Sequence, residues 1–454
     1  MGSTHTLRRA LAVVALALSL STLAWVTGFR FPGVRDDQGP RTPVLRGDTD
    51  GSVVLPLTGE GLGRRLDTLR RHLRAQPRDA ANWAALGSAC VEQARRTADP
   101  GLYGQAQRAF ARSLALSPAP GNSGALAGQA ALAAARHDFF AALRLADRSL
   151  AVSPYGELAL AVRVDALVEL GRYDAAHRAA LRADARRPGI PAFTRFAYVA
   201  ELRGERATAR RVLEQALAPT SAPGDIAHLA TALGELSRSE GKPGPALRSY
   251  AVALRADPGH VPALLGRGQV RAAVGDLAGA VRDLEAVVAR QPLPAHLALL
   301  GEMYAARGER RAAARQYAAL DAWTRLARAQ RVNTDLDTAL VAADHGERAQ
   351  ALRAARAEWK RRHTVHTADA LAWALHRRGR DAAALPLARQ ATETLTRGGY
   401  RNAAFLYHRA EIEHALGRDA EARTHGRDAL ALGTALTPQA RTALGRWVTA
   451  GEQG

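Results

Sequence analysis

One short motif recurs along this chain of 454 residues and limits what the chain can fold into. The motif is a glycine, one or more polar residues and an alanine cluster, as in GRDAEA from Gly417. Its glycines stand at Gly171, Gly204, Gly241, Gly275, Gly308, Gly346, Gly379 and Gly417, at spacings of 33, 37, 34, 33, 38, 33 and 38 residues. A period of about 34 residues predicts a solenoid of repeated helix pairs.

Each marker of the repeat has a physical role. A glycine can end a helix because it adopts the left-handed backbone conformation that the cap requires. The alanines after it let two helices approach closely, and a proline cannot continue the second helix. The prolines expected to end second helices are Pro118, Pro154, Pro188, Pro258 and Pro292. We expect about ten such pairs, with Trp83, Phe110, Tyr250 and Tyr317 filling the space between neighbours.

Composition agrees with an all-helical chain. Hydrophobic residues make up 47% of the sequence and aromatic residues only 5%. Alanine and leucine dominate the apolar residues, and both favour helices. Because strand-like alternation is almost absent, we expect no sizeable sheet. The length also exceeds that of one ordinary compact core, which favours an extended array.

The sequence resembles the tetratricopeptide repeat (TPR) family. Three stretches carry most of its pattern: Trp83, Leu86, Gly87, Cys90, Ala106, Phe110 and Pro118; Leu233, Gly234, Ala246, Tyr250 and Pro258; and Leu300, Gly301, Tyr304, Ala313 and Tyr317. The resemblance implies an all-α, right-handed superhelical solenoid of antiparallel helix pairs over residues 80–435. It also implies that the first helix of each pair lines a concave groove.

The sequence predicts further segments on either side of the array. A leading helix is expected in residues 58–79, and a capping helix with Trp447 in the tail of residues 436–454. Two stretches depart from the repeat: residues 320–331 continue a helix without a proline, and residues 393–401 form a longer connection. Either could mark a bend or a boundary between sub-arrays.

The first 29 residues predict export. Arg8 and Arg9 precede a charge-free stretch of residues 10–29, which is long enough to span a bilayer as a helix. Positive residues on its N-terminal side place the remainder outside the cytoplasm. The segment is either an uncleaved anchor or a cleaved signal peptide, and the absence of a following cysteine excludes a lipoprotein. Residues 30–57 carry several prolines and read as a flexible linker.

Candidate partner contacts come from the groove that the resemblance implies. The groove residues are Asp165, Tyr198, Glu201, Glu235, Arg238, Glu302, Trp373, His376, Tyr407, Glu411 and His414. Asp344 adds a further acid, so the groove leans acidic. The outward helices carry arginine pairs such as Arg144 and Arg148. This sorting of charge favours a cationic or amide-rich peptide in the groove, unless the acids only balance arginines of the same helices.

Net charge and cysteine content narrow the partners further. The chain carries 63 Lys and Arg against 43 Asp and Glu, which gives +20. Such an excess favours anionic lipid or cell-wall polymer as a partner of the outer face. The positive residues are dispersed and form no dense basic block, which favours ordinary solvated helix faces over a dedicated anion-binding surface. Nucleic acid is not expected as a partner. Because Cys90 is the single cysteine, an intramolecular disulfide is excluded. We expect Cys90 to be a small core residue. The sequence does not predict the oligomeric state.

No catalytic motif or cofactor site is recognisable in the sequence. Gly59, Gly61 and Gly63 follow no strand and do not form a phosphate loop. Histidines gather in the second half, where His376 and His414 share the register expected of the groove, but no metal ligand set follows from their spacing. The leading hypothesis is a non-catalytic scaffold that binds a protein or peptide. Adhesion through the basic outer face and metal handling by histidines are the alternatives.

Overall fold

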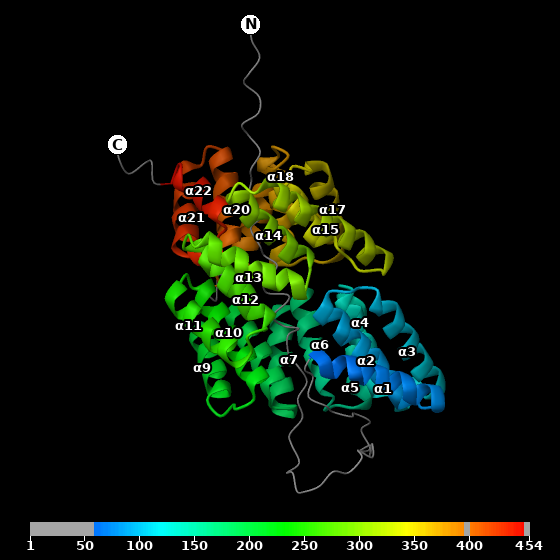
Figure 1. Cartoon of the computed structure of the whole chain (residues 1–454). Helices are drawn as coiled ribbons and strands as arrows, with labels where there is room; N and C mark the ends of the chain where they lie inside the picture. Colours follow the sequence, from blue (N-terminus) through cyan, green and yellow to red (C-terminus); the bar gives the residue numbers. More distant parts are fainter. Residues whose placement is uncertain (1–58, 395–399, 449–454) are drawn as a thin grey trace.

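The computed structural model describes residues 59–394 and 400–448, and every regular element in these residues is a helix (Figure 1). Twenty helices, α2 to α21, form ten consecutive helix pairs, in which each even-numbered helix packs on the helix that follows it. A leading helix, α1, precedes the pairs and a short helix, α22, follows them.

The first helices of the pairs are α2 (Ala80–Thr97), α4 (Ser123–Ala135), α6 (Glu157–Glu169), α8 (Ile190–Leu202), α10 (Pro223–Ser239), α12 (Val261–Ala273), α14 (Pro294–Ala306), α16 (Asp335–Asp344), α18 (Val365–His376) and α20 (Ala403–Ala415). The second helices are α3 (Leu102–Leu116), α5 (Phe139–Val152), α7 (Tyr173–Arg186), α9 (Arg206–Leu217), α11 (Pro243–Ala256), α13 (Leu277–Arg290), α15 (Arg310–Ala329), α17 (Arg348–Arg361), α19 (Asp381–Glu393) and α21 (Asp419–Ala431). The flanking helices are α1 (Gly59–Ala75) and α22 (Pro438–Gly445), and single turns of 3-10 helix, η2 and η4, span Ala119–Gly121 and Gly433–Ala435.

The motif glycines form the turn inside eight of the ten pairs. All eight adopt a left-handed backbone, with φ between 68° and 95°. His137 takes the same place between α4 and α5 with φ 59°. A side chain other than glycine is strained in this conformation, so the repeated glycine follows from the geometry of the turn.

Other glycines admit aromatic rings into the helix packing. A Cβ on Gly87 would lie 2.6 Å from the Phe110 ring, and a Cβ on Gly128 would lie 2.2 Å from it. Tyr250 is held in the same way by Gly234 and Gly266. Phe110 and Tyr250 are fully buried, so these rings fill the space between consecutive pairs, as the sequence predicts.

Five second helices end where the prolines of the sequence predict. The helices α3, α5, α7, α11 and α13 each end two residues before the prolines named above. Where the proline is missing, α15 extends to 20 residues, as the sequence predicts for residues 320–331. A proline thus marks the end of these five second helices, whereas α17, α19 and α21 end without one.

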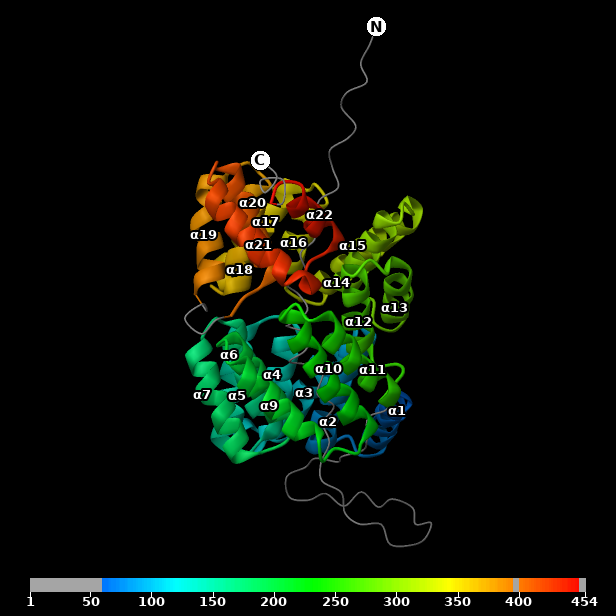
Figure 2. The same ribbon diagram turned by 90° about the vertical axis from the view of Figure 1, so that its left-hand side faces the viewer.

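The pairs form two arrays that stack on each other. We call residues 59–290, with α1 to α13, the first array and residues 294–448, with α14 to α22, the second array. Figures 1 and 2 show the second array above the first, with its yellow to red ribbons over blue to green ones. Residues almost 200 positions apart thereby become neighbours.

The stacking contacts join the C-terminal ends of first helices in the first array to helix α15, to loops of the second array and to the connection between the arrays. His137 Nδ1 lies 2.8 Å from the Asn333 carbonyl oxygen, and Asn333 N donates to the Arg136 carbonyl at 3.0 Å. The Arg362 guanidinium binds both Glu169 and Glu358. Trp323 Nε1 donates to the Ala98 carbonyl at 2.7 Å, and Gln291 Nε2 donates to the Arg95 carbonyl at 2.6 Å. Polar bonds thus fix the register between the arrays.

The interface between the arrays also contains an apolar core. One hydrophobic cluster includes Leu160, Val168 and Leu202 of the first array together with Val365 and Leu406 of the second. The two arrays therefore share part of their core instead of touching only at loops.

Several sequence predictions lie outside the described residues. The predicted membrane or signal segment in residues 1–29 and the linker of residues 30–57 belong to that part, as does most of the longer connection at residues 395–399. None of the helices in the described residues is long and apolar enough to cross a membrane.

Candidate functional site

The structure divides the predicted groove residues between the two arrays. The first array holds Asp165, Tyr198, Glu201, Glu235 and Arg238, and the second holds Glu302, Trp373, His376, Tyr407, Glu411 and His414. All of them lie on first helices, as expected. Their surroundings differ, because the stacking of the arrays covers the ends of first helices in the first array.

Asp165 forms a buried ion pair in the first array. Both of its carboxylate oxygens accept from Arg195, at 2.9 and 2.8 Å, and both side chains are more than nine-tenths buried. Arg195 belongs to the next first helix, α8, so the pair links two repeats. Burial raises the pKa of Asp165 to about 6 although the guanidinium acts to lower it.

Glu235 and Arg238 form a second buried pair within α10. Arg238 donates to Glu235 Oε2 through Nε at 2.9 Å and Nη2 at 2.7 Å. The Tyr250 hydroxyl donates to the other oxygen of Glu235 at 2.6 Å. The carboxylate is thus hydrogen-bonded on both oxygens and faces a guanidinium, which is the arrangement that makes a buried charge tolerable.

Tyr198 and Glu201 lie beside the second array. Burial raises the pKa of Tyr198 well above its usual range, and the nearby Tyr400 raises it further. Glu201 Oε1 accepts from Ser239 Oγ at 2.6 Å, and burial raises the pKa of Glu201. Their role as partner contacts stays a prediction.

An aromatic stack forms the centre of the second array. The buried Trp373 ring lies between His408, at 4.1 Å, and His376, at 4.9 Å, measured between ring centroids. The buried Tyr407 ring lies 5.7 Å from it. Trp373 Nε1 donates to Asp344 Oδ1 at 2.8 Å, so the stack also orients a carboxylate. Large buried rings with few rotatable bonds make this part of the second array rigid.

Two carboxylates beside this stack have no ion pair within the described residues. Both oxygens of Glu302 are buried and accept no hydrogen bond from any described residue, and the same holds for Asp344 Oδ2. The two side chains are each 5% exposed. Burial raises the pKa of Glu302 well above its usual range, and the Asp344 carboxylate raises it further. Burial also raises the pKa of Asp344.

The remaining predicted residues lie towards α22. Glu411 accepts from Trp447 Nε1 at 3.1 Å, and the exposed His414 ring stacks on Trp447 with centroids 4.5 Å apart. His376 and His414 each face an aspartate of the following helix, at 2.5 and 3.0 Å. In residues 59–394 and 400–448, no three metal-ligating side chains are placed to hold an ion.

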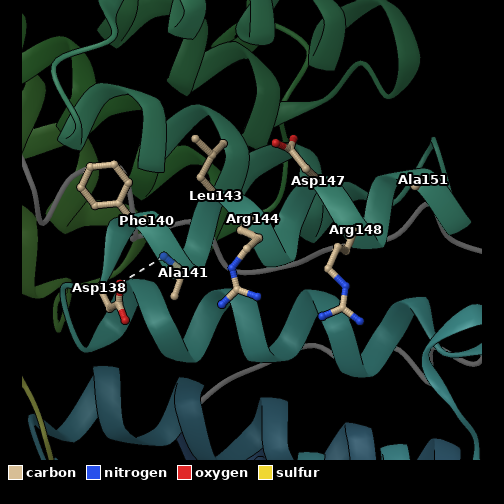
Figure 3. A pocket seen from close by; sticks show the side chains of 8 residues that line it. All are labelled: Asp138, Phe140, Ala141, Leu143, Arg144, Asp147, Arg148 and Ala151. Atoms are coloured by element: carbon tan, nitrogen blue, oxygen red, sulfur yellow. Dashed lines mark hydrogen bonds between the residues drawn. The ribbon is translucent and has the colours of Figure 1, made fainter.

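The outer face carries a shallow pocket of about 840 Å³ along α5. Arg144 and Arg148 point to the same side of this helix, and Phe140 and Asp147 lie on its other side (Figure 3). Phe140 is 54% exposed, and Asp147 binds Arg163 at 2.6 Å. Two arginines and an exposed aromatic ring thus line one pocket of the outer surface.

Sequence reasoning missed the partners of the inner acids. Arg195 and Tyr250 were not expected to bind Asp165 and Glu235. Comparison of equivalent repeat positions could have shown which of the two glutamates has an arginine beside it. LGELSR at 233–238 and LGEMYA at 300–305 differ in the residue three positions after the glutamate.

Comparison with known proteins finds similarity only to solved structures, and that similarity is low. No protein-family model matches the chain, and no curated protein matches it. Among solved structures, the chain is similar to PilW, a widely conserved type IV pilus biogenesis factor, with 22% identity over 44% of this chain and 92% of that one and a TM-score of 0.36. It is also similar to TTC0263, a TPR protein of Thermus thermophilus, with 26% identity over 41% and 92% and a TM-score of 0.33. The APC/C hetero-tetramer Cut9–Hcn1 aligns over 85% and 93% with 12% identity and a TM-score of 0.40.

These TM-scores are low, so the assignment depends on the repeats of the chain itself. The glycines in left-handed turns, the rings held between helix glycines and the helix pairs at a period of about 34 residues are those of a TPR-like array. The chain is thus a TPR-like helical repeat protein.

Proposed function

We propose that this protein is a non-catalytic scaffold outside the cytoplasm that holds a basic segment of a partner protein on the inner face of its second array. This inner face is formed by Glu302, Asp344, Trp373, His376, Tyr407, Glu411 and His414. The observation that carries the proposal is that two acids of this inner face are buried and unpaired in the described residues. Glu302 and Asp344 are buried acids without an ion pair in the described residues, and buried carboxylates without partners are costly.

Charge and rigidity support a protein partner. A lysine or arginine side chain would supply the missing hydrogen bonds of the carboxylates, and charge-assisted bonds of this kind are among the stronger ones. The stack of Trp373, His376 and His408 holds Asp344 in place, so little ordering is needed when a segment binds. Access also favours the second array, because His376 and His414 at the ends of its first helices keep 15% and 47% of their side chains exposed.

A displayed library of random peptides tests the proposal. Full-length protein is used for selection, beside the variant Glu302→Gln/Asp344→Asn. We expect the unaltered protein to enrich peptides with arginine or lysine and the variant to lose that enrichment, because the neutral side chains no longer attract a cation. The readout is the frequency of basic residues after selection.

The control removes the same two charges from the outer surface, as Asp174→Asn/Glu214→Gln. Both of these acids lie on second helices and are exposed. The control protein should select the same peptides as the unaltered protein. Equal enrichment by the inner-face variant would show that the acids of the second array do not bind the partner.

The location outside the cytoplasm is proposed from residues 1–29 alone. Protease added to intact cells that produce the protein should digest the repeat array if the array is exported. Full protection in intact cells, combined with digestion after lysis of all membranes, would contradict this location.

A second candidate function is adhesion of the outer face to an anionic surface. The observation that favours it is the pocket on α5, which is lined by the exposed Phe140 and by Arg144 and Arg148, two arginines that form no ion pair with a described residue. Flotation with vesicles of anionic lipid tests it. We expect binding that weakens with salt and is reduced by Arg144→Gln/Arg148→Gln. Equal flotation of this variant would remove the candidate.

A further inference from the structure

Two glutamates stand at the same place in two repeats of this chain. Glu235 of α10 and Glu302 of α14 each follow a leucine and a glycine, in LGELSR and LGEMYA. A tyrosine of the second helix lies against the glycine in both repeats: Tyr250 against Gly234 and Tyr317 against Gly301. The chain thus provides an internal comparison in which the local framework is the same.

The two glutamates differ in one neighbouring side chain. Arg238, one helical turn after Glu235, places its guanidinium on the carboxylate at 2.7 and 2.9 Å. The equivalent residue beside Glu302 is Ala305, which carries no charge. Residues three apart share a helix face, so Ala305 leaves open the side from which Arg238 approaches Glu235.

The two tyrosines also differ in their hydrogen bonds. The Tyr250 hydroxyl donates to Glu235 at 2.6 Å. Both oxygens of Glu302 remain without a hydrogen bond among the described residues, including any from Tyr317. The Glu302 carboxylate therefore shares with Glu235 the glycine and the tyrosine beside it, but lacks the cation that faces Glu235.

We infer that Glu302 is the receptor for one arginine side chain of a bound protein segment, which takes the place that Arg238 has beside Glu235. This inference rests on the proposed function and assigns the ligand group to one carboxylate. Arginine is favoured over lysine because the internal copy uses a planar guanidinium that donates through two nitrogens at once.

The end of α14 offers a route to the carboxylate. Ala305 is only partly buried, and Ala306 and Arg307 after it are exposed. A long side chain can therefore lie over Ala305 with its stem on apolar atoms and its guanidinium at Glu302. At the first array this route is closed, because the Arg238 carbonyl accepts from Thr434 of the second array at 2.8 Å.

The experiment compares two peptides with full-length protein. The probes are an octapeptide of glycine and serine with one central arginine, and its twin with citrulline, which has nearly the same shape and no charge. Ligand-observed NMR titration is suited to the weak binding of such short peptides. We expect the arginine peptide to bind at least tenfold more tightly, because a hydrogen bond to a charged group contributes about 1.5 kcal/mol or more.

Three variants decide where the preference arises. Glu302→Gln should bind both peptides alike, and Ala305→Arg should do the same because it supplies the cation internally. Ala305→Arg should also melt at a higher temperature than the unaltered protein, which shows that it is folded. In Glu235→Gln/Arg238→Met, which removes the completed pair, the preference for arginine should persist.

The outcomes separate the inference from the proposed function. If both peptides bind equally to the unaltered protein, a segment is held but Glu302 is not an arginine receptor. If the arginine preference survives in Glu302→Gln and in Ala305→Arg, the guanidinium binds elsewhere. If neither peptide binds and the library selection also fails, the proposed function itself is wrong.

Discussion

The two arrays carry glutamates at one matching repeat position, Glu235 in the first and Glu302 in the second, and these have different partners. In the first array, Asp165 pairs with Arg195, Glu235 pairs with Arg238, and Glu201 accepts a hydrogen bond from Ser239. In the second array, Glu302 has no hydrogen-bond partner in the described residues, and Asp344 has one on a single oxygen.

This difference follows the architecture. The ends of first helices in the first array are covered by the second array, as at Glu169 with Arg362 and at Arg238 with Thr434. A buried interface between arrays requires its charges to be paired inside the chain. The same repeat position therefore holds an internally paired glutamate in the first array and a glutamate without an internal cation in the second, which is the proposed ligand site.

The largest expected effect on stability comes from giving Glu235 the same neighbour that Glu302 has. Arg238→Ala reproduces the alanine found beside Glu302 and leaves Glu235 buried without its guanidinium. We expect a loss of about 3–5 kcal/mol of stability, since removal of one partner exposes the cost of the buried charge. Denaturant unfolding followed by circular dichroism measures it.

The matched variant removes the pair as a whole. Glu235→Gln/Arg238→Met leaves no charge behind and should cost much less than Arg238→Ala. If both variants lose the same stability, the loss comes from packing around these side chains and not from an unpaired charge. The proposed difference between the two arrays would then be wrong.

The turn glycines give the next comparison. Gly171 and Gly417 have nearly the same φ, 72° and 71°. A Cβ on Gly171 would lie 2.4 Å from the His363 carbonyl oxygen of the second array, whereas a Cβ on Gly417 meets nothing within 4 Å. Substitution of either by alanine should cost about 1 kcal/mol from backbone strain.

Gly171→Ala must in addition push the two arrays apart, so we expect its cost to exceed that of Gly417→Ala by about 1–2 kcal/mol. Thermal unfolding of the two variants side by side provides the test. Equal melting temperatures would mean that the arrays are not stacked at this turn.

The smallest effect is a gain of stability in the second array. Burial raises the pKa of Glu302 in the folded state. The unfolded chain therefore loses the proton first, and the stability of the unaltered protein falls as the pH rises above about 4.3, the ordinary value of glutamate. Glu302→Gln removes this cost, so without ligand it should be more stable by about 1 kcal/mol at pH 7.

This gain should disappear below about pH 4, where Glu302 is protonated in both states. Unfolding of the two proteins between pH 4 and pH 8 measures the difference. A variant less stable than the unaltered protein at pH 7 would show that Glu302 already has a cationic partner in solution.

The repeats could be predicted from the sequence because their markers act locally. A glycine in a left-handed turn, as at Gly171 or Gly417, and a proline two residues after a helix, as at Pro118, need no knowledge of distant residues. The helix that carries each predicted groove residue was predicted for the same reason.

The stacking of the arrays could not be predicted in this way. Asn333 meets His137 across almost 200 residues, and no local pattern marks either of them as an interface residue. The ion pair of Asp165 with Arg195 likewise depends on the offset between two helices. Which acids are paired internally, and hence which are available to a ligand, follows from this long-range packing.

The most direct test of the account is the structure of the full-length protein in complex with a basic peptide recovered by selection. We predict an arginine guanidinium of the peptide within hydrogen-bonding distance, about 2.7–3.2 Å, of the Glu302 carboxylate. The Glu235 carboxylate should keep Arg238 as its partner. A peptide bound elsewhere, with Glu302 still lacking a cation, would contradict the central claim.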